Sequence, residues 1–331
     1  MSLLKSRPLK CPLPILLLCL LLSVLTLGFL HQSRHGQVWT AQGSSGPWPP
    51  FRPMTDFPTI QPHACVNSSR LHGVTATICV KPADKFVSAA VLSAGAWEPL
   101  LVTNMLRALS LYPSAALLDV GCNIGMFTLM AAGLGRRVLA VDAVAENLAY
   151  VHASLEKDGR TELVTLVHNS VSNEEELSLY PVLHKTQSKN PGATRLLPAD
   201  SLIYSSLAAI GPPTRSVLLA SLLSSVTSST IVLKLDIEGW ECRALLARGV
   251  FHTGKFIPYI FMEWEHLVKN AALVYDNSDN CAPLSRLLEV LAGAGYRPLH
   301  PATLAGLDNA TLHTPILDVL WVHKTARTIG L

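Results

Sequence analysis

The segment that most constrains the fold runs from Leu117 to Gly125, where an apolar stretch ends in the residues Asp-Val-Gly-Cys-Asn-Ile-Gly. A turn that brings backbone N–H groups and a helix N-terminus against a ligand leaves little room for side chains, and Gly121 and Gly125 supply that room. The next apolar stretch ends in Asp142. This order predicts the nucleotide-binding half of a doubly wound α/β sheet, although an ordinary tight turn is the simpler alternative.

The spacing of the two glycines separates the possible cofactors. The pattern Asp-x-Gly-x-x-x-Gly departs from the Gly-x-Gly-x-x-Gly fingerprint of dinucleotide-binding proteins. S-adenosylmethionine (SAM) has no pyrophosphate and is therefore the better ligand. We expect Asp119 beneath its methionyl end, Asn123 in the turn, and Asp142 on its ribose hydroxyls.

Two further polar residues follow the third expected strand. Asn169 and Ser170 are candidates for reading the edge of the adenine base, and plain turn chemistry is their alternative role.

A second motif, Leu-Lys-Leu-Asp-Ile-Glu-Gly-Trp-Glu, occupies residues 233–241. Together with LLDVGCNIGMFTLMAA, it resembles the FkbM-type methyltransferases, SAM-dependent enzymes associated with O-methylation of sugars and polyketide-type hydroxyls. The resemblance spans about residues 86 to 323, and among metazoan proteins it is strongest to the membrane-anchored methyltransferase-like branch. The chain departs from the family pattern in Asp142-Ala143, where the family often has an acid followed by proline, and in a Ser/Leu-rich insertion from Ile203 to Ser229. These departures bear on substrate choice more than on cofactor choice.

The second motif also supplies the candidate catalytic residues. Methyl transfer to a hydroxyl requires an aligned acceptor oxygen and removal of its proton, and an acid at the end of the fourth strand suits both tasks. Asp236 is the first candidate base, Glu238 is the second, and Lys234 is expected to pair with a carboxylate.

Other side chains near this motif have secondary assignments. Trp240 is a candidate wall for a sugar ring, and Glu241 is either catalytic or a helix-capping acid. Glu263, Glu265 and His266 are reserve candidates for a base or a cation ligand, although the sequence requires no metal.

Alternating apolar stretches and helical patterns after residue 85 predict a parallel sheet covered on both faces. The resemblance implies the Rossmann-like, seven-stranded sheet of class I SAM-dependent methyltransferases, in which the last strand is inserted antiparallel. The expected strands are 115–120, 137–141, 163–168, 231–236, 257–263, 296–300 and 316–323, with a helix near 97–110 before the first.

The N-terminal part predicts a location. Positive residues precede a largely apolar run from Leu13 to Leu30, which is long enough to cross a bilayer. We therefore expect a cytoplasmic tail (1–12), a signal-anchor (13–30), a Pro/Gly/Ser-rich lumenal stem (31–85) and a methyltransferase domain (86–331), in a type II membrane protein of the secretory pathway. A cleaved signal peptide, giving a secreted protein, is the alternative.

A lumenal location has two further consequences. Asn67 and Asn309 become glycosylation acceptors, and Cys65 and Cys79 become candidates for a disulfide bond.

Three functions stay open at this point. The first is a SAM-dependent O-methyltransferase acting on a glycan or another hydroxylated small molecule; the others are a non-catalytic binding module of the same fold and an NAD-dependent oxidoreductase. The net charge of +3 is small and scattered, which disfavours a nucleic-acid partner.

Overall fold

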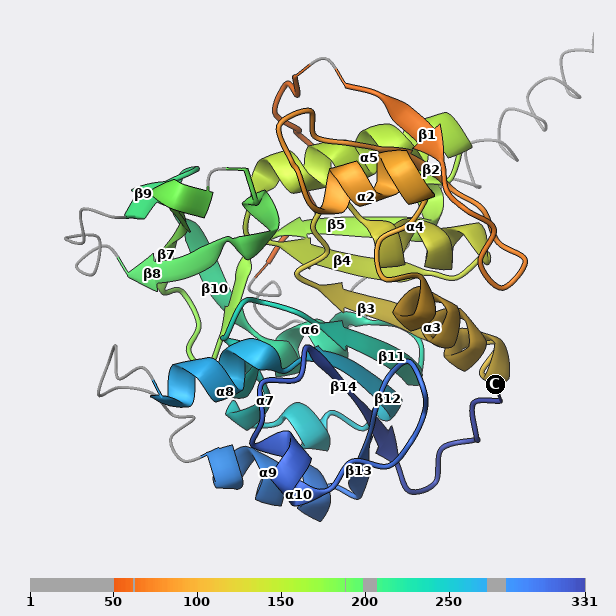
Figure 1. Cartoon of the computed structure of the whole chain (residues 1–331), viewed down its shortest axis with the longest axis vertical. Coiled ribbons are helices and arrows are strands. Elements are labelled where there is room, and N and C mark those ends of the chain that lie inside the picture. The colour runs from red at the N-terminus through yellow and green to blue at the C-terminus, as the bar shows by residue number, and fades with distance from the viewer. Residues whose placement is uncertain (1–50, 62, 188, 199–206, 273–283, 331) are drawn as a thin grey trace, which may run out of the picture. The chain divides into compact units, whose positions relative to one another are not determined.

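Seven strands form the central sheet of the computed structural model, which describes residues 51–330 except 62, 188, 199–206 and 273–283 (Figure 1). In sheet order they are β13 (Tyr296–Leu299), β14 (Asp318–His323), β12 (Phe256–Glu263), β11 (Thr230–Leu235), β3 (Ala116–Val120), β4 (Val138–Asp142) and β5 (Val164–His168). β14 is antiparallel to both of its neighbours, and all other neighbouring pairs are parallel. The predicted doubly wound, seven-stranded sheet, with its inserted antiparallel strand, is therefore confirmed.

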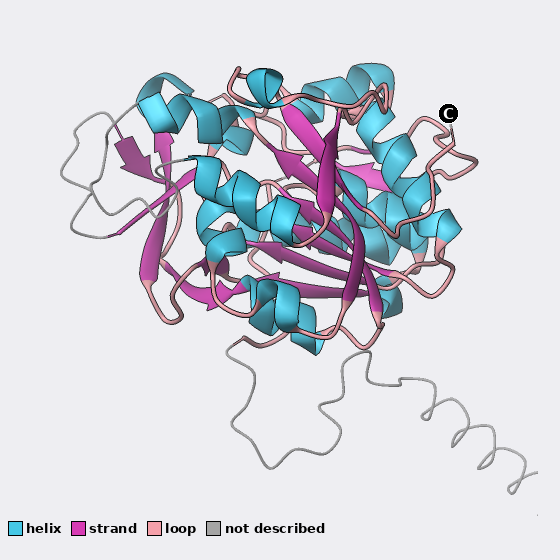
Figure 2. Ribbon diagram, turned by 90° about the horizontal axis from the view of Figure 1, so that it is seen from below, coloured by secondary structure: helices cyan, strands magenta, loops and turns pink. Residues whose placement is uncertain are grey.

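The central strands are apolar because helices cover them. Every residue of β3 and β4 is buried, as expected for parallel strands enclosed on both faces. In one group, α4 (Met126–Gly133) packs against both α3 (Pro99–Leu111) and α5 (Ala145–Asp158). A second group contains α7 (Glu241–Leu246), α8 (Glu265–Ala272) and α9 (Leu284–Gly293). Figure 1 shows the two groups apart, with strands of the sheet between them, and Figure 2 shows helices on both sides of the strands.

The predicted stem requires a correction between residues 51 and 85, because this segment packs into the domain. The hairpin of β1 (Cys65–Asn67) and β2 (Thr77–Cys79) lies on α5, where the Cys79 amide donates to Ser154 Oγ. Ile78 and Cys79 are fully buried. Further upstream, Pro53 forms a bridge with Val167 and the Met54 amide donates to the Leu166 carbonyl, along β5. Prolines prevent a helix here but permit an extended strand at a sheet edge.

A short helix, α2 (Val87–Ala94), follows this segment and precedes α3.

A second, smaller sheet is formed by the chain between β5 and β11. Its strands, in order, are β6 (Ser170–Ser172), β10 (Thr214–Leu218), β7 (Ser178–His184) and β8 (Arg195–Pro198), and β9 (Leu207–Ala209) also pairs with β7. The Ser/Leu-rich insertion, for which a partly helical lid and a poorly ordered segment were the two expectations, forms β9, β10 and the helix α6 (Leu219–Ser225) in its described part. Leu219, Leu222 and Leu223 are fully buried, so these leucines belong to the core.

The predicted disulfide is present, because Cys65 and Cys79 are bonded across the β1–β2 pair. Cys242 is also disulfide-bonded, and Cys122 is a buried free cysteine. No helix in the described ranges has the length and apolarity needed to span a bilayer. The predicted tail (1–12) and anchor (13–30) lie outside those ranges.

Candidate functional site

The turn between β3 and α4 lies at the carboxyl end of the sheet and leaves no space for side chains at Gly121. A Cβ atom there would lie 1.6 Å from the Asp236 carbonyl oxygen, and Gly121 has φ +79°. Gly125, with φ +87°, is the N-cap of α4, and a Cβ there would lie 2.7 Å from Val151. Both glycines are therefore required by close packing as well as by backbone conformation.

A cavity of about 540 Å³ opens above this turn. Seven of the ten predicted site residues line it: Gly121, Asn123, Asp142, Asn169, Ser170, Asp236 and Glu238. The volume lies within the range typical of small-molecule sites. The fold thus brings together residues from four separate strand ends, as predicted for a sheet of this type.

Asp142 organises the side of the cavity next to β4. Its Oδ2 accepts from the Asn123 amide (2.8 Å), and its Oδ1 accepts from the Val144 amide (2.8 Å) and from Asn147 Nδ2 (3.0 Å). A carboxylate offers about four lone pairs, so one acceptor position is left for a ligand. Burial raises the pKa of Asp142, and these hydrogen bonds act in the opposite direction.

Asp119, expected beneath the methionyl end of SAM, lies outside the cavity lining. Asp119 is fully buried and is not among the lining residues; its Oδ2 accepts from Thr128 Oγ1 at 2.6 Å. Its Oδ1 has no hydrogen-bond partner within the described part of the chain. Asp119 therefore supports the turn from below, because its position in the middle of the sheet directs it into the α4 packing.

Asn169 and Ser170 line the cavity beyond Asp142. Asn169 Nδ2 donates to the Arg215 carbonyl at 2.9 Å, which ties β5 to the second sheet. Ser170 is 2% exposed, and its Oγ lacks a hydrogen-bond partner among the described residues. Buried hydroxyls normally have a hydrogen-bond partner. Because Ser170 also lines the cavity, a ligand there could supply the partner that its hydroxyl lacks.

Lys234 and Asp236 form an ion pair at the end of β11, with Nζ and Oδ2 2.8 Å apart. Lys234 lies beneath the cavity and does not line it, whereas Asp236 does. Burial alone lowers the pKa of Lys234, but Asp236 and Asp119 outweigh burial and raise it above its ordinary value. Lys234 thus stays charged and balances the two aspartates.

Glu238 follows Asp236 in a left-handed conformation, with φ 57°. Burial first, and then the nearby Glu263, raise its pKa well above the ordinary value. His266 lies between these two glutamates: its Nδ1 is 2.8 Å from Glu263 Oε1 and its Nε2 is 3.5 Å from Glu238 Oε2. All three side chains line the same cavity.

Two residues of the second motif have structural roles. The buried Glu241 carboxylate accepts from the amides of Ile237 (2.7 Å) and Gly239 (3.0 Å), so it holds the loop that carries Glu238. Trp240 is not among the lining residues, and the Arg243 guanidinium lies over its ring, 4.4 Å from the centroid.

Sequence reasoning missed two acids and one wall of the cavity. Glu98, at the N-cap of α3, has its pKa raised to about 7 by burial and by Asp236. Asp318, at the start of β14, has its pKa raised to about 8 by burial and by Glu98. The missed wall contains Gln187 and residues 190–194. The expected antiparallel strand could have indicated Asp318. No sequence pattern indicates Glu98 or the wall formed by Gln187 and residues 190–194.

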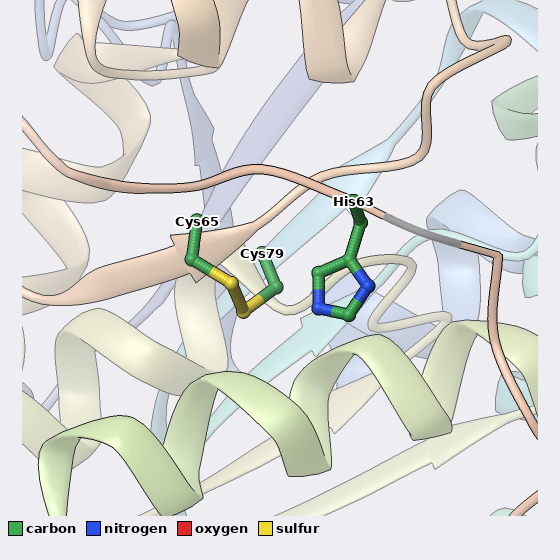
Figure 3. Close-up of side chains that lie close together, drawn as sticks. All are labelled: His63, Cys65 and Cys79. Carbon is green, nitrogen blue, oxygen red and sulfur yellow. A yellow bond between two sulfur atoms is a disulfide. The ribbon is translucent and has the colours of Figure 1, made fainter.

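A second group of possible metal ligands contains His63, which does not line the cavity, and the two cysteines of the β1–β2 hairpin. Figure 3 shows His63 next to Cys65 and Cys79. Because both sulfurs are in the disulfide, they offer no thiolate to a metal ion.

Comparisons with known proteins give distant likenesses only. No protein-family model matches the chain, and no curated protein matches it. Among solved structures, the METTL16 methyltransferase domain is 11% identical, with a TM-score of 0.37, over 70% of this chain and 71% of that one. The 16S rRNA methyltransferase RsmC of T. thermophilus, in complex with AdoMet and guanosine, is 16% identical, with a TM-score of 0.37, over 81% and 51%. Magnesium protoporphyrin IX methyltransferase from Synechocystis, with bound SAM, is 9% identical, with a TM-score of 0.35, over 68% and 78%.

Proposed function

We propose that the protein is a SAM-dependent O-methyltransferase of the FkbM type, acting on a hydroxyl of a glycan or of another hydroxylated small molecule. One observation carries the proposal: the predicted cofactor residues and the predicted catalytic acids line a single cavity. That cavity lies at the carboxyl ends of the strands, where sheets of this kind bind their ligands.

The residues on one side of the cavity fit the parts of SAM. Gly121 leaves its backbone open to a ligand, Asp142 retains an acceptor position for a ribose hydroxyl, and the unpaired Ser170 hydroxyl suits the adenine edge. When bound, SAM supplies an electrophilic methyl group on its sulfonium.

The other side of the cavity carries the acid–base groups. Asp236, whose charge Lys234 balances, is the first candidate to accept the proton of the acceptor hydroxyl as the oxygen takes the methyl group. Glu238 is the second, because its carboxylate lines the same cavity two residues after Asp236. The products are the methyl ether and S-adenosylhomocysteine, and the proton passes from the carboxylate to solvent.

We also propose a secretory lumenal location for this activity. The positively flanked apolar run at 13–30 supports a membrane anchor, and the disulfides support an oxidising compartment. Asn67 and Asn309 are both exposed, which is compatible with glycosylation. The acceptor side of the cavity is acidic, which disfavours a phosphate backbone as substrate.

Calorimetric titration of the full-length chain in detergent tests the proposal. We expect S-adenosylhomocysteine to bind, NAD not to bind, and Asp142→Ala to abolish binding while Glu289→Gln, on an exposed helix surface, retains it. Binding of NAD instead would favour the oxidoreductase. Binding of S-adenosylhomocysteine without methyl transfer to any glycan or hydroxylated acceptor would favour the non-catalytic module.

A further inference from the structure

Glu238, Glu263 and His266 converge from three different elements. Glu238 follows β11, Glu263 ends β12, and His266 lies in the first turn of α8. Each offers one ligand atom, and these atoms lie within 4.8 Å of one another. The three side chains are 16%, 17% and 18% exposed, so water has little access to them.

Two carboxylate oxygens in this group have no hydrogen-bond partner among the described residues. Glu238 Oε2 and Glu263 Oε2 are shielded from solvent, and neither accepts a hydrogen bond from any described residue. Buried carboxylate oxygens are normally paired, and an unpaired charged group costs more than a neutral one. His266 is the adjacent group that can carry a positive charge.

The histidine cannot satisfy both glutamates as a neutral ring. If Nδ1–H donates to Glu263 Oε1, Nε2 presents a lone pair towards Glu238 Oε2, at 3.5 Å. Two electron-rich atoms then face each other, which is the arrangement of two ligands around a cation.

Two lysines at the cavity already have carboxylate partners. Lys234 pairs with Asp236, and Lys269 pairs with Glu265. Among the described residues, neither Glu238 nor Glu263 forms an ion pair with a lysine or an arginine.

We propose that Glu238, Glu263 and His266 bind one divalent cation of the first transition row, with Mn²⁺ as the best match. Carboxylates suit Mn²⁺, and an imidazole ligand favours transition metals over Mg²⁺ and Ca²⁺. The role of the cation rests on the proposed function: beside Asp236, it would hold and polarise the acceptor hydroxyl.

Manganese binding can be measured without cofactor or acceptor. The full-length chain, treated with chelator and dialysed, is titrated with Mn²⁺ while the electron paramagnetic resonance signal of free Mn²⁺ is followed. We expect one Mn²⁺ per chain, and a loss of affinity of at least about tenfold in Glu263→Gln and in His266→Ala. Glu289→Gln removes the same charge from the exposed surface of α9 and should leave binding unchanged.

A direct readout on the unmodified chain protects the test against misfolded variants. Pulsed resonance of the bound Mn²⁺ should show coupling to one imidazole nitrogen. Absence of binding by the folded protein, binding unchanged in both variants, or bound Mn²⁺ without nitrogen coupling would overturn the proposal. Titration of the same preparation with S-adenosylhomocysteine tests the methyltransferase separately, so the two failures can be told apart.

Discussion

Replacing Gly121 with alanine tests the packing of the turn between β3 and α4 against the end of β11. The added Cβ would lie 1.6 Å from the Asp236 carbonyl oxygen, whereas real Cβ contacts are not shorter than 3.0 Å. The Asp236 backbone must therefore move by at least 1.4 Å, the difference between the two distances. This movement disrupts the 3.0 Å hydrogen bond from the Asp236 amide to the Val120 carbonyl.

Two contributions make up the expected loss of stability. Alanine in the left-handed conformation costs about 1–2 kcal/mol, and forcing atoms into a filled space costs about 1–3 kcal/mol more. Gly121→Ala should therefore lower the free energy of unfolding by about 2–5 kcal/mol. Gly159 is the matched control, since its φ is +62° and no atom lies within 4 Å of its added Cβ. Gly159→Ala should cost only about 1–2 kcal/mol.

Urea unfolding of the two variants, followed by circular dichroism, measures both losses. The difference between them isolates the contact with Asp236, because the backbone conformation is similar at both glycines. Equal losses for Gly121→Ala and Gly159→Ala would refute the close approach of the two strand ends.

Three further predictions concern other parts of the molecule. The raised pKa of Glu98, about 7 against 4.5, means that its stabilising contribution is complete below pH 4.5 and is lost as pH rises through 7. Urea unfolding should therefore show stability falling between pH 5 and 7, and Glu98→Gln should flatten that slope; an unchanged slope would contradict the assignment. Reduction of the Cys65–Cys79 bond, which closes a short loop, should lower the free energy of unfolding by about 3 kcal/mol. Cys65→Ala/Cys79→Ala, which keeps the disulfide of Cys242, is the reference in thermal melts; reductant should destabilise it less than the parent protein, and an equal response of both proteins would argue against this bond. Thr128→Val removes the donor to the buried Asp119 and should cost about 1–3 kcal/mol, whereas Thr128→Ser keeps a hydroxyl and should cost less; equal losses in urea would show that the hydroxyl does not matter.

The central sheet and most of the cavity residues at its strand ends were predictable from the sequence because their signals are local. Apolar stretches that end in Asp119, Asp142 and Asp236 mark strand ends, and the sheet order brings those ends together. The glycine turn could likewise be recognised from its own residues.

Other features were missed because they depend on long-range packing. Glu98 becomes a cavity residue only through the way α3 packs, and it carries no motif of its own. The hydrogen bond of Asp119 to Thr128 of α4 likewise depends on how the helix packs on the sheet, which the sequence of β3 does not show. The proline-rich composition of 51–62 indicated a spacer, since composition does not show that a segment pairs with a strand more than 100 residues away.

The pairing of Pro53 and Met54 with β5 also determines how the sheet meets other molecules. An unpaired edge strand can accept strands from other chains, and natural proteins block such edges. At the β5 edge, the Met54 amide donates to the Leu166 carbonyl. At the opposite edge, Pro298 of β13 has no N–H group to donate, and its carbonyl accepts from the Leu307 amide. A truncated chain that begins after residue 60 would expose the edge of β5 and become prone to concentration-dependent self-association. The N-terminal extension of this domain thus protects its solubility.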